Sequence, residues 1–265
     1  MSSYLYILFL LISFGASSIG AICGIGGGVI IKPLLDAFGV LSVSNISFLS
    51  GCTVLAMTCY SVVKSRLSGE SLVDMGIGTP LAIGAAIGGV AGKSMFQMIS
   101  NLFADKDMVG AVQAACLLVI TLGTLIYTVK KDRIRTLHVE NIGVCVIIGL
   151  ILGIFSSFLG IGGGPINLVV LFFFFSMNTK TAAQNSLYII LFSQIFSLLN
   201  SLVTKSVPDF APLLLALMVA GGILGGIFGR RINCHIEEKV VDQLFIMLMI
   251  IIICINIYNI YQFMH

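Results

Sequence analysis

The chain has 265 residues, of which 58% are hydrophobic and only 9% are charged, and its mean hydropathy is +1.12. A water-soluble globular domain carries about 25% charged residues and cannot bury this much apolar surface. The formal net charge of +3 gives no indication of a nucleic-acid partner. Several apolar stretches reach the roughly 20 residues that cross a bilayer as a helix, so composition predicts an all-α integral membrane protein of the lipid bilayer.

The first apolar run, residues 4–38, contains the motif GIGGG at residues 24–28. The run lacks a basic leading segment and a small-residue cleavage site, so we expect structure rather than a cleaved signal. A continuous helix of about 35 residues would be about 52 Å long, which exceeds a hydrocarbon core of about 30 Å yet is too short for two complete spans. We therefore expect one span, a break at the glycines and a shorter helix that turns back.

The remaining predicted elements are apolar stretches separated by short polar connections. In chain order they are spans near residues 43–63, 72–92 and 108–129, a charged cytoplasmic linker at 130–141, a second GIGGG run over 142–177, and spans near 181–203, 210–229 and 241–262. Each half thus reads as a broken helical hairpin followed by three transmembrane helices.

The second GIGGG motif, residues 160–164, repeats the first at a shift of 136 positions. At a shift of 137, GAAIGGVAGKSM (from residue 84) aligns with GGILGGIFGRRI (from residue 221), and Lys93 falls on Arg230. Two matches at nearly one offset predict an internal duplication. We expect a first transmembrane repeat over residues 1–129 and a second over 142–265.

The basic residues discriminate between two ways of threading this chain through a membrane. If each GIGGG run folds back, one side of the membrane receives Lys64, Arg66, Lys130, Lys131, Arg133, Arg135, Lys180, Arg230, Arg231 and Lys239. Only Lys93, Lys106, Lys205 and Lys32 then remain elsewhere. The positive-inside rule prefers this threading, which predicts two inverted repeats in the cell (plasma) membrane with both termini outside. Inverted repeats with broken helices are a common plan of secondary transporters.

The glycine motifs are predicted to open a binding site. Non-helical backbone inside a membrane is tolerated where it is buried or lines a cavity. After each break a short helix begins, with its free N–H groups and positive dipole end directed into the break. Two such ends would form an anion site near the midplane. The predicted substrate-binding residues of the two motifs are Gly24, Gly26, Gly27, Gly28, Gly160, Gly162, Gly163 and Gly164.

Close helix packing is the alternative explanation for glycine in a membrane helix. It suffices for two triplets with a spacing of four, which are Gly84, Gly88 and Gly92, and Gly221, Gly225 and Gly229. A run of glycines, by contrast, destroys a helix. Pro165, directly after the second motif, suits the first turn of a helix, whereas the first half has Val29 there.

Small polar residues open the span that follows each motif. We expect Ser47 and Ser50 in the first half, and Gln184 and Asn185 in the second, to bind substrate, because uncharged donors suit an oxyanion that must be released again. Ordinary interhelical hydrogen bonds are the alternative role. The same spans also carry Asn45, Thr53, Ser186, Ser193, Gln194 and Asn200.

Lys32 and Asp36 form a charged pair one helical turn apart inside or near the membrane. A charge at the bilayer centre costs about 3 kcal/mol on insertion scales, so such a pair needs an explanation. One interpretation is an ion pair near the membrane surface, with Lys32 snorkelling to the headgroups. The other makes Lys32 a switchable partner of the anion.

No catalytic chemistry is visible in the sequence. The seven cysteines form no C-x-x-C pair, and the three histidines lie in predicted loops or at the chain end. We therefore expect neither enzyme activity nor a metal or other cofactor. No Asp or Glu lies deep in a predicted span, so no carboxylate relay is visible, and either a proton or sodium could be the coupling ion.

The paired motif carries a resemblance to a known family. The duplicated GIGGG-x-I, with Pro33 closing the first copy, resembles the sulfite exporter TauE/SafE family, also called the 4-toluenesulfonate uptake permease family. The second copy departs from it, with Leu168 and Val169 where the proline would stand. The resemblance covers essentially the whole chain and implies transport of a small sulfur-containing anion such as sulfite, thiosulfate or an organosulfonate. A channel or permease for another small anion or ion is the alternative.

Overall fold

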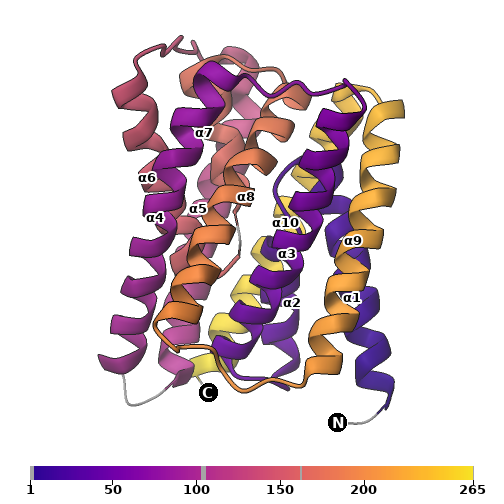
Figure 1. Ribbon diagram of the computed structural model, residues 1–265, viewed down its shortest axis with the longest axis vertical. Coiled ribbons are helices and arrows are strands. Elements are labelled where there is room, and N and C mark those ends of the chain that lie inside the picture. Colours follow the sequence, from indigo (N-terminus) through magenta and orange to yellow (C-terminus); the bar gives the residue numbers. More distant parts are fainter. Residues whose placement is uncertain (1–2, 103–105, 162, 265) are drawn as a thin grey trace.

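The computed structural model describes residues 3–102, 106–161 and 163–264, which form ten α-helices, one 3₁₀ turn and no strand (Figure 1). The helices are α1 (Ser3–Cys23), α2 (Gly28–Phe38), α3 (Val43–Leu67), α4 (Met75–Leu102), α5 (Lys106–Lys130), α6 (Ile142–Phe158), α7 (Pro165–Phe175), α8 (Thr179–Val203), α9 (Pro212–His235) and α10 (Glu238–Met264). The 3₁₀ turn, Lys131–Arg133, follows α5.

Seven helices of the described chain are long and apolar enough to cross a membrane, namely α1, α3, α4, α5, α8, α9 and α10. Helices α2, α6 and α7 are shorter, with 11, 17 and 11 residues. The prediction of an all-α integral membrane protein is confirmed. The helices correspond to the predicted spans, although α4 continues to Leu102 and α9 to His235, beyond the predicted ends near residues 92 and 229.

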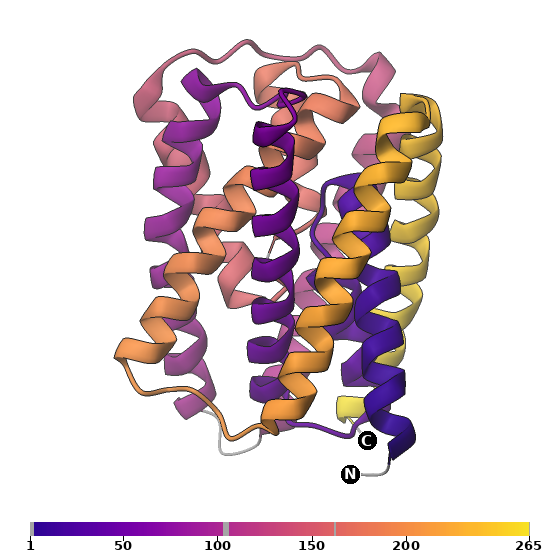
Figure 2. The ribbon, with the colours of Figure 1, turned by 45° about the vertical axis from the view of Figure 1, so that its right-hand side comes forward.

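The two helices on either side of each glycine break form a hairpin that turns back inside the bundle. The chain leaves helical geometry between α1 and α2, and again between α6 and α7, and the second helix of each pair runs back toward the end from which the first one came (Figures 1 and 2). The start of α1 and the end of α10 consequently lie at the same end of the molecule. The connection after α5 crosses the opposite end, where α3 and α9 also finish.

Glycine residues form the contacts between two pairs of outer helices, α4 with α6 and α9 with α1. Each of the six glycines in the two triplets of α4 and α9 faces backbone of a neighbouring helix, α6 and α1 respectively. A methyl group on Gly88 would lie 2.1 Å from the carbonyl oxygen of Leu150, and one on Gly225 would lie 2.4 Å from that of Phe14. Glycine therefore lets these helices approach more closely than any side chain would allow. Through these contacts α4 packs on α6, and α9 packs on α1.

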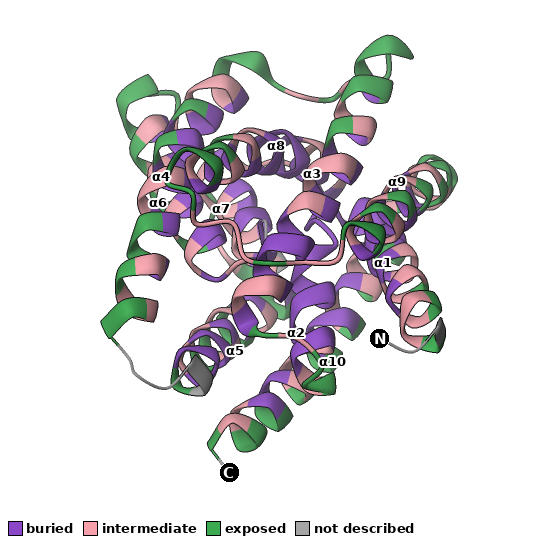
Figure 3. Ribbon diagram, turned by 60° about the horizontal axis from the view of Figure 1, so that its bottom comes forward, coloured by how far each residue is buried: buried purple, intermediate pink, exposed green. Residues whose placement is uncertain are grey.

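The buried core surrounds the two short helices that follow the breaks. Figure 3 shows buried residues gathered on the inner helices, with exposed positions on the outer ones. Eight of the eleven residues of α2 are buried. The outer helices expose large apolar side chains such as Ile7, Ile87 and Leu224, as expected of surfaces that face lipid tails.

Candidate anion-binding site

The two glycine breaks meet through matched contacts. Gly24 (φ +75°) and Gly160 (φ +65°) have left-handed backbone, which glycine adopts without steric cost. A methyl group on Gly24 would lie 2.2 Å from Cα of Ala183 in α8, and one on Gly160 would lie 2.4 Å from Oγ of Ser47 in α3. Ser47 and Ala183 are themselves 136 positions apart. Each break thus packs against the helix that follows the other break.

Direct contact between the breaks is equally close. A methyl group on Gly28, the first residue of α2, would lie 1.9 Å from the carbonyl oxygen of Ile161 in the second break. Gly26 (φ +73°) and Gly163 (φ +127°) also have backbone that favours glycine, and Gly163 packs on Ile190. Gly162 lies outside the described residues. The motif residues that the structure describes therefore come together in one place at the centre of the bundle.

Side-chain amides cap the helices that enter the breaks. Nδ2 of Asn233 donates to the carbonyl oxygen of Ile22 at 2.6 Å, near the end of α1. Nε2 of Gln113 donates to the carbonyl oxygen of Phe158 at 2.5 Å, at the end of α6. Ile22 and Phe158 are equivalent by the 136-residue shift. The negative dipole end of each entering helix is therefore partly compensated by a donor from elsewhere in the fold.

The helices that leave the breaks have no such compensation. The residues that directly precede α3, α6 and α8 are Ser42, Asn141 and Asn178. The side chain of each accepts a hydrogen bond from a backbone N–H of the first turn. Gly27 and Gly164, which precede α2 and α7, provide no side-chain cap. In these first turns the N–H groups of Ile30 and Asn167 donate to the carbonyl oxygens of Gly27 and Gly164, and Pro165 has no N–H. The N–H groups of Gly28, Val29 and Ile166 are left at two positive dipole ends, an arrangement that suits an anion.

Buried hydroxyls without a partner surround the same place. Oγ of Ser17, Ser47 and Ser50 makes no hydrogen bond, and none of these residues is more than 5% exposed. Ser186, the counterpart of Ser50 at the 136-residue shift, is also buried with an unpartnered hydroxyl. Oγ of Ser17 lies 2.9 Å from a methyl group placed on Gly27, and that of Ser50 lies 3.0 Å from one on Gly28. A buried polar group without a partner costs about 1–3 kcal/mol, so several together indicate a place for a polar ligand.

The buried amide of Asn167 adds to this group. Asn167 is in the first turn of α7 and is 1% exposed, and its Oδ1 has no partner. Ser156 and Ser157, in the last turn of α6, are buried with unpartnered hydroxyls as well. The second break therefore has polar side chains on both helices that meet at it.

Lys32 and Asp36 form an ion pair on α2, with 2.6 Å between Nζ and Oδ2 and only 4% of each side chain exposed. Lys32 does not snorkel to a surface, and Asp36, predicted to lie at the end of a span, is buried. The reason is that α2 is inserted among other helices, where Nδ2 of Asn259 in α10 donates to the carbonyl oxygen of Pro33 at 2.8 Å. Cε of Lys32 lies 3.5 Å from a methyl group placed on Gly160, so the pair borders the second break.

Gln184 and Asn185 are turned toward the connection between α3 and α4. Oε1 of Gln184 accepts from Oγ of Ser65 at 3.0 Å and from the backbone N–H of Leu72 at 2.8 Å. Nδ2 of Asn185 donates to the carbonyl oxygens of Leu72 and Thr181 at 3.2 and 2.9 Å. The structure therefore brings Ser47 and Ser50 to the breaks. Gln184 and Asn185 lie beside the connection between α3 and α4, where Oδ1 of the buried Asn185 has no hydrogen-bond partner, and their role in binding stays a prediction.

Several residues of the site escaped the sequence-based selection. Ser186 could have been chosen from the repeat, because it matches Ser50 at the 136-residue shift. Ser17 has no such signal, since its counterpart is Gly153. Gln113 and Asn233 reach the breaks from α5 and α9, and no motif connects them to the glycines.

Comparison with known proteins identifies the family. Residues 9–256 match the family described as sulfite exporter TauE/SafE. The chain belongs to this family. The resemblance predicted from the paired motif is therefore confirmed, and the protein is a multi-pass membrane transporter of a family that carries sulfite or related anions, and not an enzyme. No curated protein and no solved structure matched the chain.

Proposed function

We propose that this TauE/SafE protein is a secondary transporter of small sulfur-containing anions (sulfite, thiosulfate or an organosulfonate) that works by alternating access. The anion binds between the N-termini of α2 and α7. The observation that carries this proposal is the pair of helix starts without side-chain caps, set among buried hydroxyls that have no partner.

The chemistry of these groups suits an anion that is bound and then released. Backbone N–H and serine O–H groups donate to sulfur-bound oxygens, and the two helix dipoles stabilise the negative charge. Lys32 is already paired with Asp36, so it adds little net charge at rest. A site that depends on neutral donors and partial charges holds the anion without a full opposing charge, which favours rapid exchange.

The repeated packing supports two inverted halves, residues 1–129 and 142–265, as the moving parts. Each half contributes the same order of five helices. The first hairpin helix of each half packs on the fourth helix of the other half, α1 on α9 and α6 on α4. Ten basic residues at one end of the bundle assign that end to the cytoplasm by the positive-inside rule, with both termini outside the plasma membrane. Rocking of one half against the other would then expose the breaks alternately to each side.

Uptake of labelled sulfite into proteoliposomes tests this function. Competition by thiosulfate, sulfate, a sulfonate and chloride, with and without a pH or sodium gradient, identifies the substrate class and the coupling ion. We expect saturable uptake with counterflow, inhibited by sulfur oxyanions and not by chloride. Uptake that does not saturate would instead support a channel, and no uptake of any sulfur anion by folded protein would contradict the proposal.

A further inference from the structure

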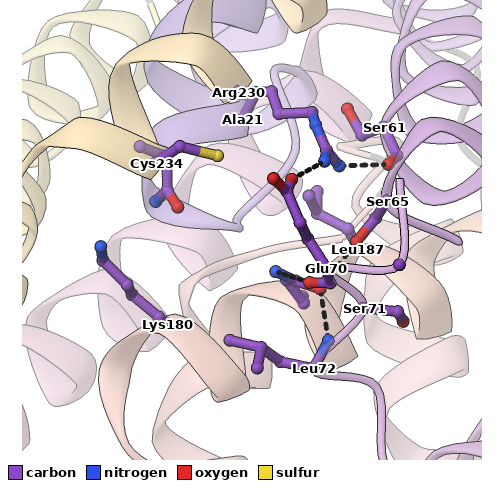
Figure 4. A pocket seen from close by; sticks show the side chains of 13 residues that line it. Ala21, Ser61, Ser65, Glu70, Ser71, Leu72, Lys180, Leu187, Arg230 and Cys234 are labelled. Atoms are coloured by element: carbon purple, nitrogen blue, oxygen red, sulfur yellow. Dashed lines mark hydrogen bonds and ion pairs between the residues drawn. The ribbon is translucent and has the colours of Figure 1, made fainter. Parts of the chain in front are cut away.

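A cavity with several polar and charged side chains lies at the end of the bundle that carries the basic residues. Its volume is about 380 Å³, and it is enclosed by the ends of α1, α3 and α9, the start of α8 and the connection between α3 and α4 (Figure 4). The side chains that matter for its chemistry are Ser61, Glu70, Lys180, Gln184, Arg230 and Asn233. None of the predicted binding residues in the glycine motifs lines this cavity.

One cation of the cavity is held by an internal carboxylate. Nη2 of Arg230 lies 2.6 Å from Oε2 of Glu70, and it also donates to Oγ of Ser68 at 3.1 Å. The Arg230 side chain is only 16% exposed, whereas that of Glu70 is 60% exposed. A solvent-exposed carboxylate on a connection thus neutralises a largely buried guanidinium.

The second cation has no counter-ion. Lys180, near the start of α8, extends into the cavity from the side opposite Glu70 (Figure 4). No hydrogen bond or ion pair joins it to the residues that the structure describes. The cavity therefore contains two cations and one carboxylate, and the carboxylate occupies a position where an oxyanion would accept a hydrogen bond from Nη2 of Arg230.

An apolar layer separates this cavity from the breaks. Ala21 and Leu187 line the cavity and belong to a small buried cluster with Val54, Met57 and Ile190. On the other side of that cluster, Cγ1 of Ile190 lies 2.3 Å from a methyl group placed on Gly163 of the second break. The cavity is thus one residue layer from the central site.

We infer that this cavity is a vestibule in which the transported sulfur oxyanion binds Arg230 and Lys180 by displacing the carboxylate of Glu70, before it crosses the apolar layer to the breaks. This inference rests on the proposed transport function. Glu70 thus competes with the anion for Arg230. It neutralises Arg230 when no anion is bound, and it pairs with Arg230 again when the anion leaves.

Kinetics on each membrane face test the vestibule. The KM for labelled sulfite is measured in inside-out and right-side-out membrane vesicles that contain the full chain. Because Arg230 supplies a charge-assisted contact, R230Q should raise the KM about tenfold or more in inside-out vesicles only, and K180Q should raise it by a smaller factor. E70Q should lower it about threefold, since the competing carboxylate is removed.

R231Q is the matched control, because Arg231 is the neighbouring residue on α9, is exposed and does not line the cavity. It should leave the KM unchanged. Equal shifts for R230Q and R231Q, equal shifts on both faces, or a raised KM for E70Q would overturn the vestibule. Lys180 has no partner to lose, so K180Q keeps the test valid if R230Q fails to fold. Absence of sulfite transport by the unmodified protein would instead remove the proposed function itself.

Discussion

The two glycine breaks have the same backbone plan but different side chains. Both place a left-handed glycine on a span of the other half, and both end at an uncapped helix start. The first carries Lys32 and Asp36 on the helix that follows, whereas Leu168 and Phe172 stand at the equivalent positions of α7. The backbone therefore supplies a nearly symmetric positive potential, and only the first half adds an ion pair.

This difference indicates that the backbone of the breaks and the Lys32–Asp36 pair have separate roles. In the proposed alternating-access cycle, a symmetric backbone site would be exposed to each face in turn. An ion pair in one half alone can respond to the bound anion without that symmetry. Variants that disturb the backbone of a break should therefore affect the fold, and variants that change one side chain beside it should affect binding.

Alanine at the left-handed glycines should have the largest effect. In G24A the alanine must adopt a left-handed backbone conformation, which costs about 1–2 kcal/mol. Its methyl group also clashes with Cα of Ala183. G160A should be milder, because the nearest atom, Oγ of Ser47 at 2.4 Å, can rotate away and only Cβ of Ser47 at 2.8 Å must then shift. We expect G24A to abolish transport and to lower the melting temperature more than G160A does, as measured by thermal unfolding in detergent.

G15A is the control for this comparison, since a methyl group on Gly15 of α1 meets nothing within 4 Å. It should keep both transport and melting temperature. Equal behaviour of G24A and G15A would show that the break does not need glycine.

Neutralising one member of the ion pair should have the next largest effect. K32Q leaves the buried Asp36 carboxylate without a counter-ion, and breaking a buried pair costs about 3–5 kcal/mol. The double variant K32Q/D36N removes both charges and should recover most of that stability. If Lys32 contacts the anion, the double variant should still show a raised KM for sulfite.

The two readouts separate the roles of Lys32. Thermal unfolding reports the lost pair, and proteoliposome uptake reports the anion contact. A double variant with both wild-type stability and wild-type KM would limit Lys32 and Asp36 to a neutral structural pair.

The architecture was largely predictable because it depends on local properties. The length of the run over residues 4–38, set against the thickness of a bilayer, required a break, and four glycines identified its position. The distribution of basic residues predicted the direction in which the chain returns. These arguments need only the chain itself and the membrane as solvent.

The side chains around the breaks were less predictable because they depend on how distant helices interlock. Asn233 and Gln113 cap helices that are far away in sequence, and no local pattern marks them. Asp36 looked like a residue at the end of a span, but α10 covers it by packing on α2. The Gln184 side chain, predicted to bind substrate, accepts hydrogen bonds from Ser65 and Leu72, which lie far away in the sequence.

Removing the equivalent hydroxyls of Ser50 and Ser186 should have the smallest effect and the most specific one. Each is fully buried and has no partner in the absence of an anion, so S50A and S186A leave no group unsatisfied and should not lower the melting temperature. If these hydroxyls donate to the anion, each variant should raise the KM for sulfite about threefold to tenfold.

T58V is the control, because the Thr58 hydroxyl already donates to the carbonyl oxygen of Val54 at 2.8 Å and is not expected to contact the anion. It should change stability slightly and leave the KM unchanged. Similar KM shifts for S50A and S186A would mean that the anion contacts both halves equally. A shift in only one of them would mean that the asymmetry seen at Lys32 extends to the donors. No shift in either would remove both hydroxyls from the site, and the binding energy would then come from the helix N-termini alone.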